Sequence, residues 1–123
     1  MISRTKLYSQ LDRMESELAA ELRPHLEQAA NGDNPLVFCV AEFNPNPAQY
    51  PCNDTNTEKL VRLGRQILAL REKLGEPADG TPAERLCWYC RQWAATANGE
   101  AKTARELAAD FLQEILKPPY RGQ

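Results

Sequence analysis

The sequence predicts an all-α protein, a four-helix bundle-like domain that spans residues 1–123 as one unit. In four stretches, apolar residues recur three or four positions apart, which is the spacing of one face of an α-helix. The motif Thr-x-x-Glu occurs three times, beginning at Thr55, Thr81 and Thr103. It is typical of helix N-termini, because the threonine and glutamate side chains satisfy amide groups that lack a partner within the helix. A chain of this length can form one domain with its own core.

The first predicted helix, at about residues 3–30, is long and kinked. Pro24 has no N–H group, so we expect a kink over residues 20–23. Asn31 and Gly32 should end the helix, because glycine readily adopts the left-handed conformation of a C-cap. The apolar face of this helix consists of Leu7, Leu11, Met14, Leu18, Leu22 and Leu26.

The other three helices are predicted at about residues 57–74, 82–97 and 100–116. Pro82 suits the first position of the third helix, where its missing N–H costs nothing. Gly75 should end the second helix. The three apolar faces consist of Leu60, Leu63, Ile67, Leu70 and Leu74, then Leu86, Cys90, Trp93 and Ala97, then Leu107, Ala108, Phe111, Leu112, Ile115 and Leu116.

Residues 31–56 form the predicted connection between the first two helices, and this loop is too long for a simple turn in a compact bundle. Its apolar run from Leu36 to Ala41 should be buried against the bundle. We therefore predict one short extended segment at residues 36–40. A lone strand needs a partner, so pairing with the same segment of a second copy would make the protein a homodimer.

Composition narrows the classes of function. The net charge of −2 and the pI of about 5.5 argue against a dedicated nucleic-acid-binding protein, which would usually be basic. No apolar run approaches the roughly 20 residues that a membrane span needs, so we predict no membrane partner. The first residues carry charges where a signal peptide would have an apolar core. We therefore expect a cytoplasmic protein whose cysteines stay reduced.

The leading functional prediction comes from the loop. The chain has no lysine or arginine between Pro24 and Glu58, and the same stretch is rich in aromatic residues and proline. Rigid apolar anchors in an acidic setting favour a protein-recognition surface, because they lose little entropy on docking. We predict a non-catalytic interaction or regulatory module that binds another protein. The predicted contact residues are Phe38, Phe43, Asn44, Pro45 and Tyr50, followed by Trp88 and Tyr89.

An alternative interpretation is a small zinc-stabilised domain. Cys87 and Cys90 have the spacing of half a zinc site, and Cys39 and Cys52 would complete it if the loop folds over the third helix. However, residues three apart on a helix share a face without any metal. Both cysteines would then be buried apolar residues. The main prediction therefore includes no cofactor, and zinc belongs to the alternative.

A second alternative is a nucleic-acid-binding regulator that uses the basic face of the second helix. A solvated outer face explains the same charges more simply. For catalysis, no nucleophile, base and orienting group can be assembled from the sequence, so we predict no enzyme and no catalytic residues. The residues of the basic face are Lys59, Arg62, Arg65 and Arg71.

Overall fold

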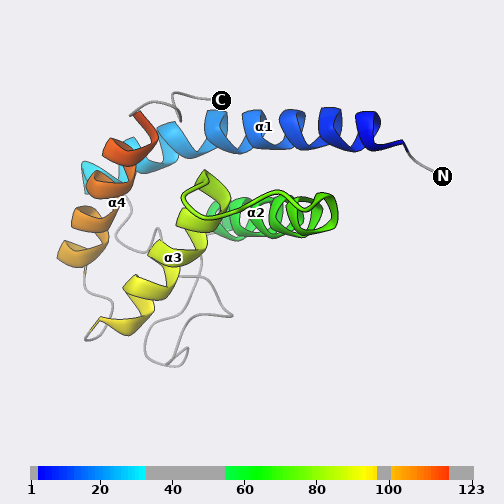
Figure 1. Ribbon diagram of the computed structural model, residues 1–123. Helices are drawn as coiled ribbons and strands as arrows, with labels where there is room; N and C mark the ends of the chain where they lie inside the picture. Colours follow the sequence, from blue (N-terminus) through cyan, green and yellow to red (C-terminus); the bar gives the residue numbers. More distant parts are fainter. Residues whose placement is uncertain (1–2, 33–54, 97–100, 117–123) are drawn as a thin grey trace.

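The computed structural model describes residues 3–32, 55–96 and 101–116, and four helices account for most of them (Figure 1). The helices are α1 (Arg4–Ala30), α2 (Thr55–Leu74), α3 (Pro82–Ala95) and α4 (Ala101–Leu116). No strand occurs within these ranges, and the all-α prediction is confirmed. The extended segment predicted at 36–40 lies outside the described residues, as does most of the predicted loop 31–56.

The other three helices pack around α1. It contacts α2, α3 and α4, while α3 also packs against α2 and α4. In Figure 1, α2 lies alongside α1, α4 crosses the C-terminal part of α1, and α3 lies between α2 and α4. Among the described residues, no helix has the length and apolarity that crossing a membrane would require.

The core forms where the predicted apolar faces meet. Trp93 and Phe111 are its largest side chains, with exposed fractions of 1% and 0%. Burial of each such side chain contributes about 1.5–3 kcal/mol. Some predicted members are only partly buried, among them Met14, Leu63 and Leu70. Leu116, at the end of α4, was also predicted on an apolar face, but it is exposed. The buried cluster includes Leu7, Leu11, Leu18, Leu22, Leu26, Leu60, Val61, Ile67, Leu74, Leu86, Tyr89, Cys90, Ala104, Ala108 and Ile115.

Helix α1 has a defined cap at each end. Ser3 is its N-cap, and the Ser3 hydroxyl accepts a hydrogen bond from the amide of Lys6 at 3.3 Å. The helix continues through Pro24 without interruption, and its axis bends toward α4 along the C-terminal half (Figure 1). Gly32 follows the C-cap with a φ of 86° and donates to the carbonyl of Ala29 at 3.0 Å. The end predicted at Asn31 and Gly32 is therefore confirmed.

The link from α2 to α3, residues 75–81, begins with a Schellman motif. Gly75 has a φ of 72°, and its amide donates to the carbonyl of Glu72, while the Glu76 amide donates to Arg71. Two contacts then attach this region to α1. The Tyr8 hydroxyl donates to Glu76 Oε1 at 2.5 Å, and Arg4 Nη2 donates to the carbonyl of Leu74 at 3.2 Å.

The Thr-x-x-Glu motif that begins at Thr81 has its threonine as the N-cap of α3. Its hydroxyl accepts from the amide of Glu84 at 3.5 Å, and the Glu84 carboxylate accepts from the amide of Gly80 at 3.1 Å. Helix α2 begins at Thr55 itself and α4 begins at Ala101, so Thr55 and Thr103 lie within their helices. The start of α4 agrees with the predicted boundary at about residue 100, whereas α2 begins two residues before the predicted boundary at 57, so Thr55 does not precede the helix as a capping box would require.

Helix α3 ends at Ala95, two residues before the predicted boundary at 97. The cause is Thr96, whose backbone turns to an extended conformation with a ψ of 156°. Its hydroxyl donates to the carbonyl of Trp93 at 2.6 Å, and its amide donates to the carbonyls of Gln92 and Trp93. Local hydrogen bonds of this kind compete with helix continuation.

Candidate functional site

The outer side of α3 carries a cluster of aromatic and charged side chains. Arg85 precedes Trp88 by three positions and Tyr89 by four, so helical spacing places all three on adjoining parts of one face. The Cζ atom of Arg85 lies 4.2 Å from the centroid of the Trp88 ring and 5.3 Å from that of Tyr89. Both distances are within the range of a cation–π interaction.

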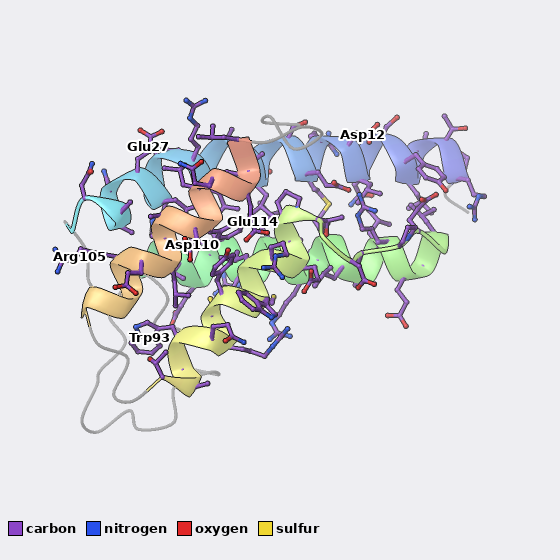
Figure 2. The ribbon with its side chains drawn as sticks, turned by 60° about the vertical axis from the view of Figure 1, so that its left-hand side comes forward. Asp12, Glu27, Trp93, Arg105, Asp110 and Glu114 are labelled. Atoms are coloured by element: carbon purple, nitrogen blue, oxygen red, sulfur yellow. The ribbon has the colours of Figure 1, made fainter. Side chains whose placement is uncertain are left out.

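Glu114 of α4 fixes the position of the Arg85 guanidinium. Arg85 Nε donates to Oε1 at 2.9 Å and Nη2 donates to Oε2 at 3.3 Å, so the pair is bidentate. The Tyr89 hydroxyl donates to the same carboxylate. Figure 2 shows Glu114 between α4 and α3, where one carboxylate joins two residues of the neighbouring helix.

Tyr89 anchors the cluster in the core. Its side chain is only 3% exposed, and its ring stacks on Phe111 with centroids 4.6 Å apart and an interplanar angle of 16°. The other contact is with Trp88, whose ring meets that of Tyr89 edge-on at 4.8 Å. Both geometries are favourable for aromatic pairs. The Trp88 indole is therefore held on one side by a buried aromatic ring.

The electrostatics of the cluster suit a fixed scaffold. Burial, followed by the hydrogen bond to Glu114, raises the pKa of Tyr89 above its ordinary value of 10.0. Burial lowers the pKa of Arg85, but the Glu114 carboxylate outweighs this effect and the pKa is raised overall. The phenol therefore stays protonated and donates, and the guanidinium stays charged. The arrangement therefore holds the Trp88 indole in place.

We call Arg85, Trp88, Tyr89 and Glu114 the Trp88 platform. Trp88 is partly exposed, whereas Tyr89 is buried. Of the two residues predicted as secondary partner contacts, Trp88 thus offers aromatic surface and Tyr89 supports it from below. The primary predicted contacts Phe38, Phe43, Asn44, Pro45 and Tyr50 lie outside the described residues.

The paired cysteines are on α3. Cys87 and Cys90 are 4% and 0% exposed, in line with small apolar residues on the inner side of the helix. Within the ranges that the structure describes, no three His, Cys, Asp or Glu residues are placed to hold a metal ion. Cys39 and Cys52 lie outside those ranges, so the four-cysteine zinc site stays a prediction.

The basic face predicted on α2 is divided in the structure. Lys59, Arg62 and Arg65 are exposed, whereas Arg71 is directed toward α1. Arg71 Nη2 lies 2.7 Å from Glu15 Oε1, and its Nη1 donates to the carbonyl of Pro77 at 2.6 Å. The Arg71 guanidinium is thus engaged with α1 and the α2–α3 link, and nucleic-acid binding stays a prediction that rests on the other three cations.

The sequence prediction did not include the pairing of Arg85 with Glu114. The position of Arg85, one helical turn before two aromatic residues, was a readable signal. No such signal in the sequence marked Glu114. It is 29 positions from Arg85 and reaches it only through the packing of α4 on α3.

The fold and the Trp88 platform define a small all-α domain with an aromatic and charged surface on its third helix. No protein-family model, curated protein or solved structure matches the chain. The functional argument therefore depends on the chemistry of the described residues.

Proposed function

We propose that the protein is a non-catalytic interaction module that binds another protein, with Trp88 as an anchor of its contact surface. The observation that supports this proposal is the fixed orientation of a partly exposed indole by Arg85 and Tyr89. Tryptophan, tyrosine and arginine are the residues most enriched at the energetic centres of protein interfaces. A side chain that is already held in place loses little conformational entropy when a partner covers it.

The acidic aromatic loop 31–56 is the other half of the proposed contact surface. It supplies Phe38, Phe43 and Tyr50 as further anchors, and its lack of lysine and arginine favours a partner with a basic or neutral contact face. The proposal also includes a regulatory role in the cytoplasm and, through the extended segment at 36–40, self-association as a homodimer. Cell fractionation and analytical ultracentrifugation test these two points.

The test compares protein capture by four purified baits from the same lysate. They are the wild type, Trp88→Ala, the double variant Phe43→Ala with Tyr50→Ala, and Tyr8→Ala as a matched aromatic truncation on α1. A partner found with the wild type is then purified and its affinity measured directly. Trp88→Ala should weaken binding about 30-fold, which corresponds to about 2 kcal/mol for an interface anchor. Tyr8→Ala should bind like the wild type.

Circular dichroism must show that each variant is folded before the affinities are compared. If the purified partner binds Trp88→Ala and the double variant as tightly as the wild type, neither surface is the contact surface. Loss of binding in the double variant alone would restrict the contact surface to loop 31–56 and exclude Trp88 from it.

A further inference from the structure

A second candidate site lies between α1 and the first turns of α2, on different helices from the Trp88 platform. A pocket of about 380 Å³ opens there, lined from α1 by Ala20, Glu21, Pro24, His25 and Gln28 and from α2 by Lys59, with an apolar floor at Leu60. This volume is near the lower end of the range for ligand pockets, about 300–1,000 Å³. It suits a small molecule.

Pro24 gives this pocket a hydrogen-bond acceptor that an ordinary helix would not provide. Proline has no N–H, so the carbonyl of Ala20 lacks the donor that residue i+4 normally supplies. The proline ring also crowds that carbonyl and tilts it away from the helix axis. Ala20 and Pro24 both line the pocket and are both exposed, so this break in the helical hydrogen bonding lies at the pocket.

Charged groups of opposite sign lie on the two walls. Glu21 brings a carboxylate from α1, and Lys59 brings an ammonium group from α2. The two walls are joined by a hydrogen bond of 2.8 Å between His25 Nε2 and Thr57 Oγ1, and Thr57 is 0% exposed. This contact joins α1 to the first turn of α2, two residues before Lys59.

We propose that this pocket binds a small zwitterion of the α-amino acid class. The ammonium group of the ligand would donate to the Ala20 carbonyl and to the Glu21 carboxylate, since a primary ammonium has three donors. The carboxylate of the ligand would pair with the Lys59 ammonium. The side chain would extend toward solvent over Leu60. This site is independent of the Trp88 platform, and its failure would leave the proposed protein interaction untouched.

The experiment uses the full chain labelled with nitrogen-15 and two probes, glycine and its trimethylated analogue betaine. The probes share a carboxylate, but betaine has no N–H with which to donate to the Ala20 carbonyl. Glycine should shift the amide resonances of residues 20–28 and 59–60 in a saturable manner at concentrations up to about 20 mM, which corresponds to a binding free energy of about −2 to −3 kcal/mol. Betaine should bind at least tenfold more weakly.

The decisive variant is Pro24→Ala, which restores the N–H and lets the helix pair the Ala20 carbonyl internally. It should stabilise the fold and weaken glycine binding at least fivefold, so loss of binding cannot be attributed to unfolding. Lys59→Gln should also weaken binding. Arg23→Ala is the matched control, because Arg23 is adjacent to Pro24 but pairs with Glu27 outside the pocket.

Three results would overturn the proposal. They are an absence of saturable shifts with glycine, equal responses to glycine and betaine, and unchanged glycine binding by both Pro24→Ala and Lys59→Gln.

Discussion

Gly64 of α2 lies directly against Ala83 of α3, with space for one additional methyl group between them. A Cβ atom at Gly64 would lie 3.7 Å from the Cα, Cβ and carbonyl oxygen of Ala83, which is ordinary van der Waals contact. Glycine in a helix interior is less favourable than alanine by about 0.5–1 kcal/mol. Gly64→Ala should therefore raise the free energy of unfolding by about that amount, measured by urea denaturation.

A larger residue at the same position provides the contrasting control. Gly64→Leu would have to displace the backbone of α3, and it should lower the free energy of unfolding by about 1–3 kcal/mol. Destabilisation by Gly64→Ala as well would show that the two helices are closer than described.

The two glycines that end α1 and α2 should be sensitive to substitution for a conformational reason. Gly75 has a φ of +72° and open space around its Cβ position, so Gly75→Ala tests backbone strain alone. A left-handed conformation costs an ordinary residue about 1–2 kcal/mol. Gly32→Ala should cost somewhat more, because its Cβ would lie 3.0 Å from the Cδ of Arg105, near the end of α1 (Figure 2). Thermal unfolding of the two variants measures the difference, and a neutral Gly75→Ala would contradict the positive φ.

Thr81→Ala should lower the free energy of unfolding by about 1 kcal/mol, because the amide of Glu84 loses the hydroxyl that caps α3. The control is Thr103→Ala, which the sequence motif alone would rank as equally harmful. Thr103 lies inside α4, where alanine has the higher helix propensity, so this variant should be neutral or slightly stabilised. Equal decreases in the free energy of unfolding of the two variants would indicate that Thr103 caps α4.

Stability should fall above about pH 10, partly because of Tyr89. Its pKa is raised in the folded protein, so the unfolded chain releases this proton first as the pH rises. The folded state then holds more protons, and the free energy of unfolding decreases with increasing pH. The contribution of Tyr89 to the free energy of unfolding is complete below the unfolded pKa of 10.0 and is lost as the pH rises through the folded pKa. Urea denaturation between pH 9 and pH 11 should show a steeper decline for the wild type than for Tyr89→Phe.

Tyr8 contributes a decline of the same sign, because the hydrogen bond to Glu76 raises its pKa as well. Part of the decline in the free energy of unfolding with pH should therefore remain in Tyr89→Phe and disappear only when Tyr8→Phe is added. Identical slopes in all of these proteins would show that neither phenol is held protonated by the fold.

The Arg85–Glu114 pair should show measurable but modest coupling in a double-mutant cycle with Arg85→Gln and Glu114→Gln. The side chains are 23% and 35% exposed, so solvent screens their attraction. We expect a coupling of about 1 kcal/mol or less, which decreases further in 1 M salt. Coupling that does not change with salt would indicate that packing on Trp88, and not charge, carries the interaction.

Residue spacing predicted the four helices and most of the core, because the periodicity of apolar residues is a local property that packing then uses. Leu18, Leu22 and Leu26 are examples, since each was predicted from its spacing and each is buried. The Thr-x-x-Glu motif was less reliable. The motif caps α3 at Thr81, which Pro82 follows, but lies inside α4 at Thr103.

The tertiary contacts of the candidate sites were not predictable from spacing. Glu114 joins Arg85 and Tyr89 only because α4 packs on α3. Arg71 was grouped with the exposed cations of α2, but its guanidinium meets Glu15 of α1, 56 positions earlier. A single-sequence pattern shows which face of a helix is polar, but it does not show which polar residue of another helix will be opposite.

The position of α1 at the centre of the packing has a consequence for how the chain folds during synthesis. This helix is synthesised before α4, yet its C-terminal half packs against α4. Until residue 116 has left the exit tunnel, the apolar face around Leu22 and Leu26 lacks its final cover. Such exposed apolar surface is a target for chaperones and a risk for aggregation. Packing of the C-terminal half of α1 is therefore complete only after α4 has been synthesised.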